Sequence, residues 1–150
     1  MSQEKYRIKS AAYIVPRKGD EVLLSLRKGT GFMDGYYSLV AGHIEEDESA
    51  EHAAIREASE ESGIGLNDDQ LTFVYVMHRY NANPDDAYID VFFEVREWQG
   101  EFENMEPEKC GGLDWFDINN LPDNTIPYVA DVLTSYQTGE RYKSIERQSS

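Results

Sequence analysis

Three glutamates between residues 57 and 61 have a spacing that could bind a divalent cation. Glu57, Glu60 and Glu61 are related as i, i+3 and i+4, so on a helix their carboxylates share one face. Like charges at this spacing repel each other and destabilise an isolated helix. Hard cations such as Mg2+ prefer clustered carboxylate oxygens and would relieve that repulsion. The segment therefore predicts a helix that carries a metal site.

The residues around these glutamates follow a fixed pattern. Gly42 is followed by five residues and Glu48, and then by seven residues and a run, REASEESGI, that starts at Arg56. From Gly42 to Ile64 the pattern resembles the Nudix box of the MutT-like Nudix hydrolases, with every charged and glycine position filled. Ala58 departs from the family, which usually has a larger aliphatic residue there. A match at this many positions is specific, because a glutamate-rich solvated helix would not need the rest of the box.

The resemblance implies a role for each box residue. The three clustered glutamates would hold Mg2+, with Mn2+ as a substitute, and one of them would also assist the attacking water. Arg56 would pair with a box glutamate and orient it, and Glu48 would lie either close to the metal or in a salt bridge. The backbone carbonyl of Gly42 would complete the metal shell, and the lack of a side chain would allow that close approach.

Four residues outside the box are further candidates. Many Nudix enzymes supply one more acidic group from a loop, as a metal ligand or general base, and Glu106 and Glu108 fall in such a segment. Glu108 is favoured over Glu106, and a solvated loop is the alternative. Arg27, after the second expected strand, and Arg79, beside a histidine, could each hold a substrate phosphate. The alternative for both is an ordinary surface arginine.

Asn124 lies just before the last expected helix. In Nudix members that clean oxidised guanine nucleotides, an asparagine in a similar place reads the purine edge. An amide suits that role because it donates and accepts hydrogen bonds in a matched pair. The alternative is an ordinary loop or cap asparagine.

Composition limits the classes of partner. The net charge of −15 argues against binding long nucleic acid, which usually needs a basic surface. A small anionic substrate would instead be received by bound metal and a few local basic residues. No apolar run approaches membrane-spanning length, and the N-terminus lacks the apolar segment of a signal peptide. With Cys110 as the single cysteine, no internal disulfide forms, and a cytoplasmic location is expected.

The apolar and turn-forming residues indicate strands before and after a helix. Residues 11–15 and 21–26 flank a Lys-Gly-Asp turn, so they predict a β-hairpin. Ser49 is a suitable N-cap for a helix that runs to about Ser62, and Gly63 suits its left-handed end. The other expected elements are strands at residues 38–41, 71–80, 88–98 and 111–116, and a helix at residues 122–137 with Pro127 in its first turn.

This order of elements predicts an α/β fold in which a mixed sheet lies between helices. The Nudix resemblance implies the same α/β/α sandwich. At 150 residues the chain is expected to be one domain, 1–150, with residues 139–150 as a flexible polar tail.

The resemblance implies a Mg2+-dependent hydrolase that cuts a nucleoside diphosphate linked to a group X. The first expectation is an ordinary or oxidised nucleoside triphosphate, which would give a nucleoside monophosphate and pyrophosphate. ADP-ribose, nucleotide sugars and dinucleoside polyphosphates are the alternatives, and homodimers are common in the family. A nucleotide-sensing module without turnover would usually lose box glutamates, which this chain keeps. A metal-buffering acidic protein would not need Arg56.

Overall fold

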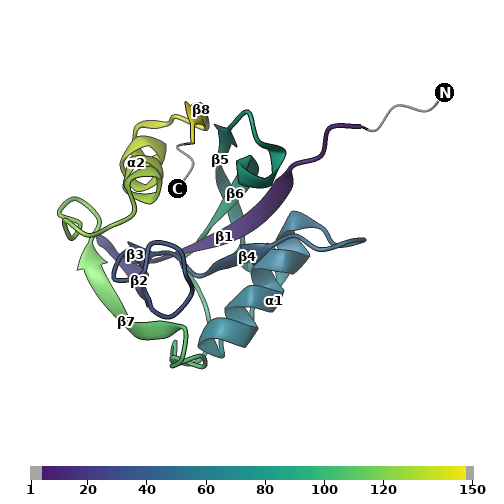
Figure 1. Ribbon diagram of the computed structural model, residues 1–150. Coiled ribbons are helices and arrows are strands. Elements are labelled where there is room, and N and C mark those ends of the chain that lie inside the picture. The colour runs from purple at the N-terminus through teal and green to yellow at the C-terminus, as the bar shows by residue number, and fades with distance from the viewer. Residues whose placement is uncertain (1–4, 148–150) are drawn as a thin grey trace.

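A long strand, β1 (Lys9–Lys18), joins the two halves of a mixed sheet in the computed structural model, which describes residues 5–147 (Figure 1). The other strands are β2 (Glu21–Arg27), β3 (Tyr37–Ser38), β4 (Ala41–His43), β5 (Thr72–Tyr80), β6 (Tyr88–Val95), β7 (Cys110–Asp117) and β8 (Tyr142–Glu146). The helices are α1 (Ala50–Ser62) and α2 (Pro127–Ser135), with short 3-10 turns at residues 68–70, 84–86 and 136–138. The hydrogen-bonded order is β3-β2-β1-β6-β5-β8, with β4 also on β1 and β7 also on β2.

Successive residues of β1 supply two hydrophobic cores on opposite faces of the sheet. Ala11, Tyr13 and Val15 belong to the core that α2 covers. Ala12 and Ile14 belong to the core that α1 covers. Because strand side chains alternate between faces, a strand buried on both faces is an almost continuous apolar run. β1 pairs in parallel with β6 and antiparallel with β2 and β4, so the predicted α/β/α sandwich with a mixed sheet is confirmed (Figure 1).

Helix α1 has a cap at each end, at the residues that the sequence predicted. The Ser49 side chain accepts a hydrogen bond from the backbone N–H of His52 at 3.0 Å. Gly63 has a φ of 72°, and its N–H donates to the carbonyl of Ser59 at 3.0 Å. Ala58 is fully buried against the sheet, so the small residue at this box position lies in the core. The caps and the buried face together fix which way the glutamates point.

Several boundaries differ from the prediction. The hairpin of β1 and β2 forms as expected, but residues 38–41 are not one strand, because the chain passes there from one partner to another. β3 pairs with β2, whereas β4 pairs with β1. The last helix starts at Pro127, its first position, and is shorter than the predicted span. Within residues 5–147, no helix has the length and apolarity needed to cross a membrane.

The segment after Gly139 is a structural element, which corrects the prediction of a flexible tail. β8 pairs in parallel with β5, and Lys143 in β8 donates to both carboxylate oxygens of Asp131 in α2 at 2.9 and 3.0 Å. Ile145 packs against the core that α2 covers. The polar composition is that of an edge strand with one solvated face, which resembles a loop in sequence. The remainder of the expected tail, residues 148–150, lies outside the described residues.

Candidate active site

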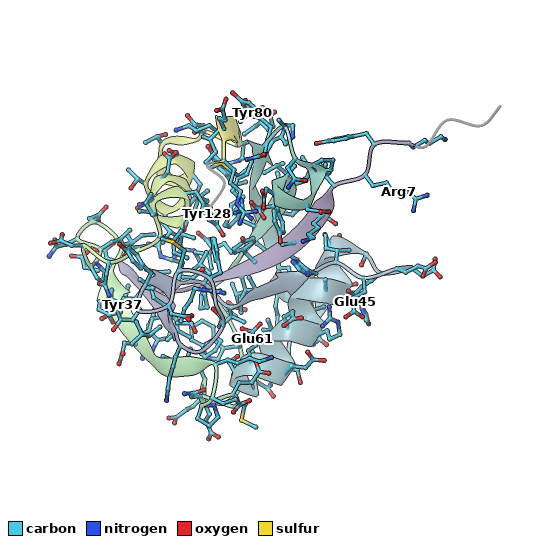
Figure 2. All side chains as sticks on the ribbon, viewed as in Figure 1. Arg7, Tyr37, Glu45, Glu61, Tyr80 and Tyr128 are labelled. Carbon is cyan, nitrogen blue, oxygen red and sulfur yellow. The ribbon has the colours of Figure 1, made fainter. Side chains whose placement is uncertain are left out.

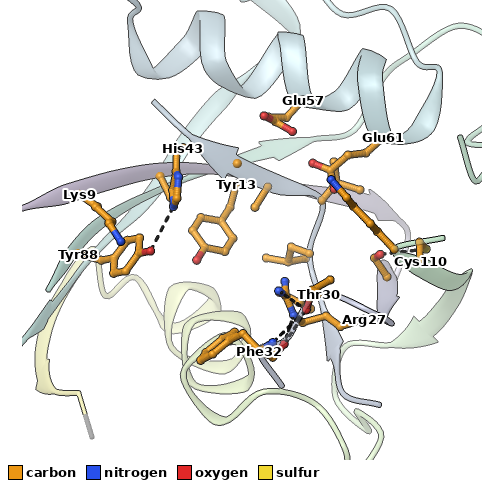
Figure 3. A pocket seen from close by; sticks show the side chains of 18 of the residues that line it. Lys9, Tyr13, Arg27, Thr30, Phe32, His43, Glu57, Glu61, Tyr88 and Cys110 are labelled. Carbon is orange, nitrogen blue, oxygen red and sulfur yellow. Dashed lines mark hydrogen bonds between the residues drawn. The ribbon is translucent and has the colours of Figure 1, made fainter. Parts of the chain in front are cut away.

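A cavity of about 720 Å³ lies between α1 and the strands that face it (Figure 3). This volume is within the range of about 300–1,000 Å³ that is usual for small-molecule sites. Glu57, Glu60 and Glu61 all line one side of it. Figure 3 shows Glu57 and Glu61 projecting from α1, and Figure 2 shows Glu61 on the side of the helix that faces the middle of the molecule. The structure therefore brings the three predicted ligands to one wall.

Arg56 organises the carboxylates next to this wall. Its Nε and Nη2 donate to the two oxygens of Glu48 at 2.8 and 3.0 Å, and its Nη1 donates to Glu57 at 2.6 Å. Nη2 also donates to the His43 carbonyl at 3.0 Å, and Glu60 accepts a longer bond of 3.3 Å. The rigid fork of a guanidinium suits such paired contacts. Arg56 thus joins the strand that precedes the helix to the carboxylates on it.

Glu48 lies in a salt bridge. Its side chain is only 6% exposed and accepts hydrogen bonds from Arg56, from the backbone N–H of Glu45 at 3.0 Å and from His52 at 2.6 Å. The hydrogen bond from Arg56 is the main reason why the pKa of Glu48 is lowered to about 2. Of the two places that the sequence left open for Glu48, close to the metal or in a salt bridge, the structure shows the salt bridge.

Gly42 leaves room for the Glu57 carboxylate. A Cβ atom on Gly42 would lie 2.2 Å from both Cδ and Oε1 of Glu57, far inside van der Waals contact. Gly42 is held opposite Ala12 of β1, so the backbone has little freedom to move aside. The sequence suggested a glycine because backbone must approach a metal closely. The structure shows a different reason, since the space is filled by Glu57 itself.

Glu61 is poorly solvated, and one of its oxygens has no partner. Burial, followed by the hydrogen bond and charge of Glu57 and the charge of Glu106, raises the pKa of Glu61 well above its usual value. Its Oε2 is buried without a hydrogen-bond partner among the described residues. A buried acceptor without a partner costs free energy, and a bound cation would satisfy it and lower that pKa. The residues present therefore fit a divalent cation.

The side chains do not form a closed metal cage on their own. Among residues 5–147, no group of three or more His, Cys, Asp or Glu side chains is arranged to hold a metal ion. Arg56 holds Glu57 and contacts Glu60, whose side chain is 56% exposed. Magnesium is usually bound through one or two carboxylates together with waters and substrate phosphates. A half-open wall of carboxylates is compatible with that mode of binding.

The loop after β6 brings Glu106, and not Glu108, to the cavity. Glu106 lines the cavity, and its charge acts on Glu61. Glu108 is exposed and does not line the cavity. Between them the chain turns, because the backbone N–H groups of Lys109 and Cys110 both donate to the Glu106 carbonyl at 2.9 Å. The structure thus favours Glu106 over the residue that the sequence favoured.

Arg27 and Asn124 both anchor the glycine-rich loop between β2 and β3. Arg27 lines the cavity and donates to the Phe32 carbonyl at 2.7 Å and to the Thr30 hydroxyl at 2.9 Å. Asn124 donates to the Gly35 carbonyl at 2.9 Å and does not line the cavity. Arg27 therefore remains a candidate phosphate ligand. For Asn124 this contact is the loop role that the sequence offered as the alternative, and purine reading stays a prediction.

Arg79 is buried in an ion pair, so it is not an ordinary surface arginine. It donates to the two carboxylate oxygens of Asp90 at 2.6 and 3.1 Å, and it lines the cavity. Its guanidinium lies 4.4 and 4.1 Å from the ring centroids of Tyr88 and Tyr128. The sequence pattern alone does not identify Asp90 as the partner of this arginine. Its position between Ile89 and Val91 is nevertheless informative, because a carboxylate inside an apolar strand needs a buried partner of opposite charge.

Comparison with known proteins identifies the family of this chain. A model of the NUDIX domain matches residues 6–136. The NAD-capped RNA hydrolase NudC of Stutzerimonas stutzeri (strain A1501) is 30% identical over 116 residues, which cover 77% of this chain and 39% of that protein. The chain thus spans about two-fifths of the length of this curated relative, 39%.

Two solved structures show the same fold. The crystal structure of a MutT NUDIX hydrolase from Burkholderia pseudomallei has a TM-score of 0.77 at 23% identity, covering 85% of this chain and 97% of that one. A bifunctional NMN adenylyltransferase/ADP ribose pyrophosphatase from Francisella tularensis, complexed with AMP and a Mn ion, has a TM-score of 0.71 at 18% identity. That match covers 91% of this chain and 43% of the other.

Proposed function

Because this chain belongs to the Nudix family, we propose that it is a pyrophosphohydrolase that splits a nucleoside diphosphate linked to a group X into a nucleoside monophosphate and phosphorylated X. The observation that carries the proposal is the wall of box glutamates, where a buried oxygen of Glu61 lacks a partner beside a cavity of suitable size. Clustered glutamates of this kind can bind a divalent cation, and the cation can then bind an anionic substrate in the cavity.

The box glutamates would hold the metal, and the remaining box residues would position them. The proposed metal ligands are Glu57, Glu60 and Glu61, together with the Gly42 carbonyl. Glu106 replaces Glu108 as the proposed additional acidic group from the loop. Bound Mg2+ or Mn2+ would neutralise phosphate charge and lower the pKa of a bound water. Arg56 orients Glu57 through its 2.6 Å bond, while the Glu48 salt bridge holds Arg56 in place.

Ordinary or oxidised nucleoside triphosphates are the first proposed substrates, with ADP-ribose, nucleotide sugars and dinucleoside polyphosphates as alternatives. Arg27 is the proposed phosphate ligand on the opposite rim. The similarity to NudC adds one more candidate substrate, NAD or the NAD cap of an RNA, because NAD is also a nucleoside diphosphate derivative. A net charge of −15 means that contact with capped RNA would be limited to the cap and not extend along the RNA body.

A sensor without turnover and a metal-buffering protein are the rival functions. A sensor has no need for Arg56 to hold Glu57 at 2.6 Å in a fixed orientation. A metal buffer has no need for the cavity. Both rivals are therefore less well supported than the hydrolase by the arrangement of α1 and the strands facing it.

The test is phosphate, pyrophosphate or nucleoside monophosphate release from a panel of these substrates, first with Mg2+ and then with EDTA. We expect turnover of one group of substrates that stops with EDTA. The variant Glu57→Gln should lower that turnover by at least about 100-fold, since it removes a charged metal ligand. The control is Glu51→Gln, which removes the same charge from the exposed face of α1. Wild-type rates in Glu57→Gln at saturating Mg2+ would exclude the proposed site, and silence across the panel with Mg2+ still bound would favour the sensor.

A further inference from the structure

Three cationic side chains converge on the ring of Tyr88. The distances to its centroid are 4.4 Å from the Arg79 guanidinium, 5.1 Å from that of Arg147 and 5.7 Å from the Lys9 ammonium. Each is within the usual reach of about 6 Å for a cation–π contact. The three come from β1, β5 and the residue after β8, so the fold and not local sequence gathers them. In a chain with 14 basic and 29 acidic residues, such a cluster of positive charge is unusual.

Much of the hydrogen-bonding capacity of this cluster is unused. Nε and Nη2 of Arg79 donate hydrogen bonds to Asp90, whereas Nη1 donates to no group within the described part of the chain. Arg147 donates from Nη1 to the Asp86 carbonyl at 2.9 Å, which is one of its five N–H groups. Neither Arg147 nor Lys9 forms an ion pair within 4.0 Å among residues 5–147. Cations with free donors are the usual means of binding phosphate.

The cluster faces the same cavity as the glutamates, at a different end. Lys9, Arg79, Tyr88 and Arg147 all line the cavity. Figure 3 shows Lys9 and Tyr88 at one end, Glu57 and Glu61 at another, and Tyr13 between them. Asp85 and Asp86 also line the cavity, so its acidic residues are not confined to α1. A ligand held at both ends must therefore present an anion to the cationic side chains and its pyrophosphate to the divalent cation that the glutamates would hold.

Arg147 lies outside the part of the chain that the NUDIX model matches, residues 6–136. Its backbone is fixed, because its N–H donates to the Tyr80 carbonyl at 2.8 Å and its carbonyl accepts from Asn81 at 2.5 Å. Its guanidinium also lies 5.2 Å from the Phe32 ring, in the loop across the cavity. The pairing of β8 thus places the guanidinium of Arg147 at the cavity, although this residue follows the part of the chain that the NUDIX model matches.

We propose that the cationic cluster of Lys9, Arg79 and Arg147 binds a phosphate monoester that the substrate carries apart from the pyrophosphate to be cleaved. This inference rests on the proposed function, and it narrows the substrate class to nucleoside diphosphate derivatives with an additional phosphate, as on a ribose hydroxyl. A phosphate monoester has nearly two negative charges and three acceptor oxygens, which suits several cations with free donors.

Binding without turnover gives the first test. Calorimetry in EDTA compares adenosine 5′-monophosphate with adenosine 2′,5′-bisphosphate and 3′,5′-bisphosphate, which differ from it by one ribose phosphate. We expect one bisphosphate to bind the wild type at least about tenfold more tightly, as one charge-assisted contact allows. Arg147→Ala should abolish most of that difference and Lys9→Gln should reduce it. Neither change should alter affinity for adenosine, which carries no phosphate, by more than about twofold.

The control variant is Arg141→Ala. It removes the same charge from the other end of β8, where Arg141 is exposed and does not line the cavity, so it should keep the full preference. Thermal unfolding of each variant checks that it is folded. Equal affinity of the wild type for all three nucleotides would overturn the proposal. Tighter binding of every nucleotide to Arg147→Ala would also overturn it, since the arginine would then be blocking the cavity.

Kinetics separate this inference from the proposed function. With Mg2+, kcat/KM is compared for NADP against NAD and for coenzyme A against 3′-dephospho-coenzyme A. A preference for the phosphorylated member that Arg147→Ala removes through KM, with kcat unchanged, supports the subsite. Turnover with no such preference in either pair would overturn the proposed phosphate subsite, whereas the proposed hydrolase function would still stand. A bisphosphate preference in calorimetry without turnover of any substrate would sustain the subsite as a binding site and count against the hydrolase.

Discussion

At the scale of single residues, the candidate site depends on how closely its carboxylates are confined. Glu57 is held between Arg56 and the bare backbone of Gly42, so its position is set on both sides. Glu61 lies deeper and its Oε2 lacks a partner. Such confinement keeps like charges close together, which costs stability in the absence of a cation but prepares the wall to receive one.

Gly42→Ala should lower turnover by about 100-fold with little loss of fold stability. Its Cβ would meet Glu57 at 2.2 Å, so the carboxylate must move, and a displacement of about 1 Å in an active site can cost that much. The measurement is kcat with saturating Mg2+, beside thermal unfolding. Gly65→Ala serves as the control, because nothing lies within 4 Å of a Cβ there. Equal activity of both variants would mean that the position of Glu57 is not critical.

The salt bridge of Glu48 should make stability depend on pH in the acid range. The pKa of Glu48 is lowered from 4.5 to about 2 in the folded protein, chiefly by the hydrogen bond from Arg56. A carboxyl with a lowered folded pKa stabilises the protein above its unfolded pKa, and the contribution is lost as pH falls from about 4.5 to about 2. Urea unfolding at pH 6 and pH 3 should therefore show Glu48→Gln to be less stable than wild type at pH 6, with a smaller gap at pH 3. A gap that did not change with pH would contradict this.

At the scale of elements, helix α1 carries the ligands and its ends decide where they point. The caps at Ser49 and Gly63 fix its length, and its buried alanines fix its rotation against the sheet. The same strand that packs under it, β1, presents its other face to α2. Strand β8 adds a second element to the cavity wall through the residue that follows it, Arg147.

Ser49→Ala should destabilise the fold by about 1 kcal/mol, since it removes the acceptor for the N–H of His52. In a domain of this size, that should lower the Tm by about 2–4 °C. Ser49→Asp should keep most of the stability, because aspartate is also a good N-cap and is favoured at a helix N-terminus. Scanning calorimetry of the three proteins measures this. An unchanged Tm in Ser49→Ala would show that the helix is held by packing alone.

At the scale of the whole molecule, the charge of −15 opposes folding through self-repulsion. Raising NaCl from 20 to about 300 mM shortens the Debye length to well under 10 Å, so it should screen this repulsion and raise the Tm. The measurement is thermal unfolding at neutral pH over a series of NaCl concentrations. A Tm that fell with salt would mean that attractive ion pairs, such as those of Arg56, outweigh the repulsion.

MgCl2 should stabilise the protein more than NaCl of equal ionic strength. A cation that binds only the folded state at 100 times its Kd contributes about 2.7 kcal/mol. The extra shift should disappear in the double variant Glu57→Gln with Glu61→Gln and persist in Glu51→Gln, which lies outside the cavity. Equal effects of the two salts on wild type would contradict a magnesium site on α1.

The sequence by itself determined the helix and what it carries. Glu57, Glu60 and Glu61, with their caps at Ser49 and Gly63, lie within a few turns of one another. Helical periodicity fixes the relative directions of side chains over such a short span, so the pattern of residue types was sufficient. The α/β/α order of layers could also be predicted, since apolar patterns show which faces must be covered.

Only the tertiary structure decided the rest of the cavity. The Arg79–Asp90 pair depends on the register of β5 against β6, the choice of Glu106 over Glu108 depends on one turn, and Arg147 reaches the cavity because β8 pairs with β5. These contacts join residues far apart in the chain, and no local periodicity encodes them. Strand pairing and loop paths are set by packing of the whole molecule, so the sequence located the glutamates while the fold selected what faces them.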